Sequence, residues 1–244
     1  MRIKSTLAFT GLAIAITGAP ATAATFSYHV TGPGGRDDAG ETKEILTTFD
    51  DETNLFTWSS TFARNQLTNV LPDGGWLVVN NGPNPKAVVK EQAIFFLDGD
   101  AEKVSIYDYN GKKGPRSWKT SSFIDSTTLD VHDAPNGDRT FSFSFDATEL
   151  NAMADTFGPD WKGVAFDEKI GVWFHGVDGL KTRYASDGSL RNFKYTDMSA
   201  FDVAMQPADM DNDAESVPEP GMALALGMTA ATAAFTKLRK RSAA

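Results

Sequence analysis

The stretch that decides the fold is Arg139-Thr140-Phe141-Ser142-Phe143-Ser144-Phe145. Its phenylalanines alternate with serines, so an extended chain places the three rings on one face and the hydroxyls on the other. This period of two predicts a strand with one buried face. The turn Pro135-Asn136-Gly137-Asp138 comes directly before it, and residues 129–132 come before the turn, which together predict a β-hairpin.

The same combination of short apolar runs and turn residues recurs along most of the chain. Residues 45–49 and 55–62 flank the acidic turn at 50–54, and residues 93–97 and 103–109 flank another turn. Further strands are expected at 25–30, 76–80, 168–175, 182–185, 189–195 and 203–205. Many short strands with turn signals between them predict a mainly β chain, arranged as an antiparallel β-sandwich of jelly-roll kind.

One short helix is expected directly after the decisive strand. Asp146 or Thr148 can cap residues 149–156, and Gly158-Pro159 ends the helical pattern. The apolar residues of this stretch lie close to one stripe: Leu150, Met153, Ala154 and Phe157. The helix is therefore expected to close an end of the sheets or to cross between them.

The N-terminus has the pattern of a secretory signal peptide. Two basic residues precede an uncharged run at 7–19, and Ala21-Thr22-Ala23 supplies the small residues of a cleavage site. Residues 1–23 are therefore expected to be removed, so that the mature chain begins at Ala24. A retained membrane helix is the alternative, but a run of 13 uncharged residues is too short to span a bilayer comfortably.

The C-terminal residues combine three features in a fixed order. Val217-Pro218-Glu219-Pro220-Gly221 is followed by an uncharged run that ends at Thr236, and then by Lys237-Leu238-Arg239-Lys240-Arg241. As a helix, the 16 uncharged residues from Gly221 to Thr236 span about 24 Å, which is marginal for a hydrocarbon core of about 30 Å. The basic residues favour the cytoplasmic side, so this hydrophobic helix leaves the preceding chain outside the inner membrane.

This order resembles the PEP-CTERM sorting signal of Gram-negative bacteria, and the resemblance covers residues 217–241. It implies export through an inner-membrane intermediate, with signal peptidase and a membrane protease called an exosortase as partners. It also implies cutting near Pro218 to Gly221 and delivery to the cell envelope, the cell surface or the medium. Proteins with this signal tend to accompany exopolysaccharide production and biofilm, and residues 166–175 and 184–193 are similar to uncharacterised β-rich bodies of such proteins. An ordinary C-terminal membrane anchor is the alternative.

Charge and cysteine content limit what the body between these segments can do. The whole chain carries a net charge of −9, and removal of the leader (+2) and of residues 217–244 (+3) leaves −14 on residues 24–216. An acidic surface repels phosphate backbones, so no nucleic acid is expected as a partner, and an acidic polysaccharide needs bridging cations. There is no cysteine and hence no disulfide framework. Residues 24–206 are therefore expected to fold as one domain held by its core, followed by an acidic linker at 207–216.

No catalytic residue is predicted from the motifs. The chain has three histidines: His29, His132 and His175. None lies at metal-ligand spacing from another, and neither a G-x-S-x-G nor an H-E-x-x-H pattern occurs. The pair His132-Asp133 lies at a strand end before a turn, where solvation rather than acid–base catalysis is expected. Two acid-rich stretches, 98–102 and 209–215, suggest Ca²⁺ binding, but both lack the other ligands of a calcium loop. A solvated turn is preferred for residues 98–102, and a flexible spacer is preferred for residues 209–215. No metal or cofactor is therefore expected.

Two function classes stay open beside this sorting. The first is a non-enzymatic cell-surface or matrix protein, as the resemblance implies, and the second is a carbohydrate-binding module in which tryptophan rings stack on extracellular polysaccharide. The five tryptophans are Trp58, Trp76, Trp118, Trp161 and Trp173. Trp118 and Trp161 lie in predicted loops and are expected to be exposed for stacking, whereas Trp58 and Trp173 lie in predicted strands and are expected in the core. A glycoside-active enzyme is a third class, but nothing marks any pair among the 32 acidic residues.

Overall fold

The structure is a computed structural model, and it describes residues 24–29, 39–80, 92–109, 114–159, 161, 163–165, 170–199 and 201–205. The predicted signal peptide, acidic linker and sorting signal lie outside the described residues. No helix in the described part of the chain is long and apolar enough to cross a membrane. The described part is mainly β and its strands pair antiparallel, which confirms this part of the expectation.

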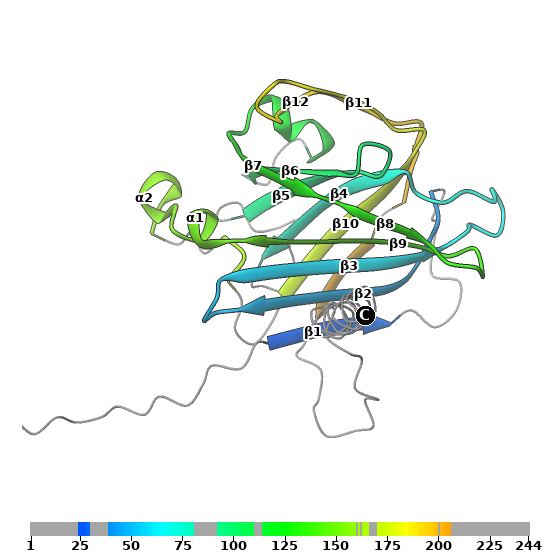
Figure 1. Ribbon diagram of the computed structural model, residues 1–244, viewed down its shortest axis with the longest axis horizontal. Helices are drawn as coiled ribbons and strands as arrows, with labels where there is room; N and C mark the ends of the chain where they lie inside the picture. Colours follow the sequence, from blue (N-terminus) through cyan, green and yellow to red (C-terminus); the bar gives the residue numbers. More distant parts are fainter. Residues whose placement is uncertain are drawn as a thin grey trace, which may run out of the picture. The chain divides into compact units, whose positions relative to one another are not determined.

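Five strands form the first sheet, in the order β1-β2-β3-β9-β8 (Figure 1). Their bounds are Ala24–His29 for β1, Glu41–Asp50 for β2, Leu55–Ala63 for β3, Asp130–Asp133 for β8 and Arg139–Asp146 for β9. The decisive strand is β9, which pairs with β8 as the predicted hairpin. It also pairs with β3, where Phe143 lies opposite Trp58. Turn signals predict only the first of these pairings, because β3 and β9 are far apart in the sequence.

The second sheet has seven strands, in the order β13-β10-β4-β5-β6-β7, with β14 also paired with β10. Its strands are Gly74–Asn80 (β4), Gln92–Asp98 (β5), Lys103–Tyr109 (β6), Phe123–Thr128 (β7), Ile170–Asp178 (β10), Asp197–Met198 (β13) and Phe201–Met205 (β14). A separate hairpin joins Lys181–Tyr184 (β11) to Leu190–Lys194 (β12), and Gly114–Lys119 forms a short 3-10 helix, η1. The sequence pattern predicts neither η1 nor β7, because residues 114–128 show no clear alternation of apolar and polar side chains.

One face of each sheet contributes to a shared inner core. Trp58 of β3 is fully buried, and its ring centroid lies 5.3 Å from that of Phe174 on β10. All three phenylalanines of β9 take part, since Phe141 and Phe143 are buried and Phe145 is half-buried against the same core. Burial of one such side chain contributes about 1.5–3 kcal/mol. The alternating pattern of β9 is therefore explained by the contact between the two sheets.

The predicted helix is present but divided into two turns, α1 (Thr148–Asn151) and α2 (Ala154–Phe157). The first backbone N–H of α1, that of Thr148, donates a hydrogen bond to the Oδ1 atom of Asp146 at 2.9 Å. The indole N–H of Trp161 donates to the backbone carbonyl of Leu150 at 2.6 Å. The same carbonyl also accepts the N–H of Met153 at 3.4 Å, an i to i+3 bond that replaces the α-helical bond to Ala154 where the helix divides. The predicted stripe packs against the inner core: Leu150, Met153, Ala154 and Phe157.

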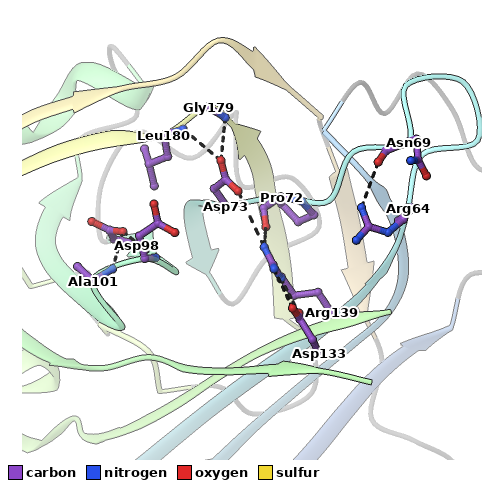
Figure 2. A network of polar contacts seen from close by, with 11 residues as sticks. Arg64, Asn69, Pro72, Asp73, Asp98, Ala101, Asp133, Arg139, Gly179 and Leu180 are labelled. Atoms are coloured by element: carbon purple, nitrogen blue, oxygen red, sulfur yellow. Dashed lines mark hydrogen bonds and ion pairs between the residues drawn. The ribbon is translucent and has the colours of Figure 1, made fainter. Parts of the chain in front are cut away.

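A polar network joins the two sheets near the start of β9 (Figure 2). Arg139 donates to both carboxylate oxygens of Asp133, at 2.7 and 2.9 Å, and to the carbonyl of Pro72 at 3.2 Å. Asp73, which leads into β4, accepts the N–H of Gly179 at 2.9 Å. The hydrogen bond from Arg139 holds the pKa of Asp133 below its ordinary value, and the same bond raises the pKa of Arg139. This network fixes the end of the first sheet to loops of the second.

Candidate functional site

The seven-stranded sheet is apolar on both faces, and the face away from the inner core carries a further cluster. Its strands are continuous apolar runs such as Trp76-Leu77-Val78-Val79, whose alternate side chains are buried on opposite faces. The outer aromatic cluster is built on the buried residues Trp76, Val78, Ile94, Phe96, Tyr107, Tyr109, Val177, Leu180, Leu190 and Phe193. Half-buried aromatic residues pack against them: Trp118, Phe123, Trp173, Tyr184 and Tyr195.

His175 lies between two tryptophans of this cluster. β10 places it opposite Trp76 of β4, and the two rings stack with centroids 4.4 Å apart. Trp173, two residues earlier on the same face of β10, meets the imidazole edge-on at 5.1 Å. Tyr195 lies 5.5 Å from the Trp76 ring. His175 is therefore a member of an aromatic stack, which motif spacing does not reveal because its neighbours come from other strands.

A buried carboxylate fastens the β11–β12 hairpin against this cluster. Asp98 is 2% exposed and accepts hydrogen bonds from the hydroxyls of Tyr184, at 2.8 Å, and Thr182. Its other oxygen accepts two backbone N–H groups of its own turn, at 3.0 and 3.1 Å. Burial, together with the negative charge of Asp98, raises the pKa of the Tyr184 hydroxyl. The acid-rich stretch at 98–102 is thus a turn, but its first carboxylate is buried rather than solvated.

Metal ligation has no support in the described part of the chain. There, no group of three or more histidine, cysteine, aspartate or glutamate side chains is placed to hold a metal ion. The second acid-rich stretch, 209–215, lies outside the described residues.

The short helix η1 places basic side chains beside half-buried aromatic residues. Trp118 packs against the outer aromatic cluster, and the Nζ atom of Lys119 lies 5.3 Å from the centroid of its ring, a cation–π contact. η1 contacts β12, the strand that ends one residue before Tyr195. Burial raises the pKa of Tyr195, and the positive charge of exposed Arg116 on η1 opposes this rise. These four residues, Arg116, Trp118, Lys119 and Tyr195, are referred to below as the basic aromatic patch. The sequence pattern misses the patch because it does not predict η1.

The two tryptophans predicted to stack on sugar have different environments. Trp118 is half-buried, so part of its ring is at the surface. The prediction that Trp161 is exposed is wrong, because Trp161 is 5% exposed and its ring lies 4.5 Å from that of Phe157. Its polar neighbours in the sequence suggest a surface loop. In the structure the indole N–H donates to a carbonyl of α1, and the ring packs in the inner core. Trp58 is buried as predicted, whereas Trp173, also expected in the core, is half-buried in the outer aromatic cluster.

A cavity of about 250 Å³ lies beside α1. It is lined by Ile106, Ile124, Asp125, Phe145, Asp146, Thr148, Glu149 and Leu150. Its isoleucines, phenylalanine and leucine are buried or half-buried, whereas its three acidic residues are exposed. Asp146 already accepts hydrogen bonds from Thr148, which lower its pKa. The lining contains no histidine, cysteine or lysine, so acid–base chemistry here depends on exposed carboxylates alone.

The candidate acid–base pair is not supported by its surroundings. His132 is exposed on β8, and the Asp133 carboxylate is bound at both oxygens by Arg139. This arrangement gives Asp133 a structural role and leaves His132 at a solvated strand end, as the sequence suggested.

The predicted processing residues Ala21 and Ala23, the motif at 217–221 and the basic residues at 237–241 lie outside the described residues. Comparisons with protein-family models, with curated proteins and with solved structures found no match.

Proposed function

We propose that the chain is an exported, non-enzymatic protein of the cell surface or extracellular matrix, sorted by an exosortase in a Gram-negative bacterium. The observation that carries this proposal is the order of a signal-peptide pattern, a β-rich body and a tail that resembles PEP-CTERM in one chain. The short uncharged run of the tail suits a temporary anchor, because it need hold only until it is cut. An association with exopolysaccharide and biofilm follows from the same resemblance.

The strand pairings are compatible with this division of the chain. Ala24, the first residue after the predicted signal-peptidase site, pairs with Phe49 of β2, and Met205 pairs with Ile170 of β10. β1 and β14 contact each other, so the first and last strands of the body are neighbours. This proximity suits a body whose leader and tail both enter one membrane while it folds outside.

We also propose that the two sheets form a β-sandwich. Side chains of both sheets share the inner core, as the packing of two sheets in a sandwich requires. Most neighbouring strands are consecutive in the sequence, while β3–β9 and β4–β10 are long-range pairings. The jelly-roll variant of the sandwich stays a prediction.

A second candidate function, carbohydrate binding, is favoured by the basic aromatic patch. Trp118 and Tyr195 are half-buried, so each ring is held in place while part of it faces solvent. Aromatic rings fixed in this way offer a surface for the apolar face of a sugar ring. Trp161 no longer supports this candidate, because its ring is buried.

The intact mass of the mature protein tests the sorting proposal. In a host with an exosortase, we expect a chain that begins at Ala24 and lacks roughly the last 24 to 27 residues, as for other processing segments. In the same host without the exosortase, the C-terminus should be complete. A C-terminus at Ala244 in both hosts would instead indicate a plain membrane anchor.

A further inference from the structure

The charge of the chain is distributed unevenly around η1. Residues 110–122 contain Lys112, Lys113, Arg116 and Lys119 and no acidic residue, so this segment carries +4. Residues 24–216 as a whole carry −14, and subtraction of this segment leaves −18 on the remainder. Mutual repulsion between negatively charged molecules keeps an acidic protein soluble. A positive segment does not add to this repulsion, so its presence calls for another explanation.

The structure fixes two of these cations beside aromatic rings. Arg116 and Lys119 are exposed, and neither forms an ion pair with a carboxylate among the described residues. Backbone N–H groups of Thr120 and Ser121 donate to the carbonyl of Ser117 at 2.8 and 2.9 Å, which closes the end of η1. The backbone that carries Arg116 and Lys119 is therefore held beside the outer aromatic cluster, and neither cation is paired with a carboxylate of the described residues.

We propose that the basic aromatic patch binds an anionic polysaccharide, one whose sugar rings carry carboxylates. This inference rests on the carbohydrate-binding candidate and specifies its ligand. The free part of the Trp118 ring stacks on the sugar, while Arg116 and Lys119 donate charge-assisted hydrogen bonds to its carboxylates. A neutral sugar makes no use of the two cations, and the patch removes the need for bridging cations that the overall charge suggested.

An anionic membrane surface fits the same patch less well. Membrane-surface binding requires apolar side chains that enter the lipid boundary. The large hydrophobic residues exposed in the described part of the chain are Leu55, Leu67 and Met198. Of these, Met198 lies beside the patch, where its sulfur accepts a hydrogen bond from the Tyr195 hydroxyl at 3.7 Å, and one methionine offers little apolar surface for insertion. Trp118 is packed against the outer aromatic cluster, so its ring is placed to stack but not to insert.

Titration calorimetry of the full-length chain, kept in a mild non-ionic detergent, tests the proposal with alginate oligomers as the anionic probe and dextran oligomers as the neutral one. We expect alginate to bind more tightly than dextran and its affinity to fall as salt rises. The double substitution Arg116→Gln and Lys119→Gln should weaken alginate binding about tenfold or more, the effect of losing charge-assisted hydrogen bonds. Lys43→Gln is a control for loss of a surface charge, because Lys43 is an exposed residue of β2 on the other sheet and its removal should leave binding unchanged.

Substitution of Trp118 separates stacking from charge. Trp118→Phe keeps a ring and should retain most of the alginate affinity, whereas Trp118→Ala should lose it while the protein still unfolds cooperatively. Equal affinity for alginate and dextran, or an equal loss in the Lys43→Gln control, would overturn the proposal. The proposal would also be overturned if the double substitution of Arg116 and Lys119 weakened binding to phosphatidylglycerol vesicles but left alginate binding unchanged. These measurements use the purified chain, so an absence of alginate binding would not affect the sorting proposal. In the same way, an unprocessed C-terminus would not affect the polysaccharide-binding proposal.

Discussion

The inner core and the outer aromatic cluster lie on opposite faces of the same seven-stranded sheet, but they differ in composition and exposure. In the inner core, rings of the two sheets pack on each other, as where Phe56 and Phe95 stack with centroids 5.6 Å apart. The outer aromatic cluster includes a histidine, packs half-buried rings and is fastened by the buried Asp98. The inner face thus specifies how the sheets pack on each other, while the outer face leaves aromatic groups partly at the surface.

Substitution of Trp58 should give the largest effect and tests the inner side of this comparison. Trp58 is fully buried between strands of both sheets. We expect Trp58→Ala to lower the free energy of unfolding by about 3–5 kcal/mol, because it leaves a large cavity. Urea unfolding followed by circular dichroism measures this loss, and Trp58→Phe should recover much of it. A loss no larger than that of a half-buried outer residue would remove the distinction between the two clusters.

Substitutions of Trp161 and Trp118 sharpen the comparison, since the sequence places both in exposed loops. Trp161→Ala should destabilise by about 3 kcal/mol, because it loses buried contacts and the hydrogen bond to α1. Trp118→Ala removes a half-buried ring and should cost about 1 kcal/mol. Equal losses in denaturant unfolding would mean that Trp118 is as much part of the core as Trp161.

Substitution of Asp98 tests whether the outer hairpin depends on one buried carboxylate. Asp98→Asn weakens the bonds from Tyr184 and Thr182 and should destabilise by about 2 kcal/mol, the scale for a hydrogen bond to a charged group. The pKa of Tyr184 should fall toward its ordinary value, because the neighbouring negative charge is gone while burial still holds it up. Urea unfolding measures the loss, and a double-mutant cycle with Tyr184→Phe isolates the coupling between the two residues. Additive losses in the two single variants and the double variant would show that Asp98 does not act on Tyr184.

Sequence reasoning predicted the parts of the fold that depend on local pattern. The alternation in β9 and the turn before it specify a hairpin, and the apolar stripe around Leu150 specifies a helix. The pairing of β9 with β3 could not be predicted, because many strands here share the same alternation and register is set by packing between them.

The candidate site was predictable only in part. Trp118 was identified because it stands among polar residues. Its basic neighbours could not be assigned to a patch from the sequence, because the contact between η1 and β12 brings them beside the outer aromatic cluster. Trp161 shows the opposite case, since this tryptophan of a polar stretch is buried in the inner core and donates its N–H to the carbonyl of Leu150 in α1. Local composition does not report such long-range contacts.

The smallest expected effect concerns the exposed network that joins the two sheets, in contrast to the buried bonds of Asp98. The pKa of Asp133 in the folded state lies below the 3.8 of an unperturbed aspartate, chiefly because Arg139 donates to it. A carboxylate with a lowered folded-state pKa stabilises the protein above its unfolded pKa, and this contribution is lost as pH falls through the folded-state value. Because Asp133 is largely exposed, the loss should stay below about 1 kcal/mol and shrink further at high salt. Urea midpoints at about pH 6 and about pH 3 measure it, and Asp133→Asn should reduce the difference between them. An identical difference in the wild type and in Asp133→Asn would show that other carboxylates carry the acid sensitivity.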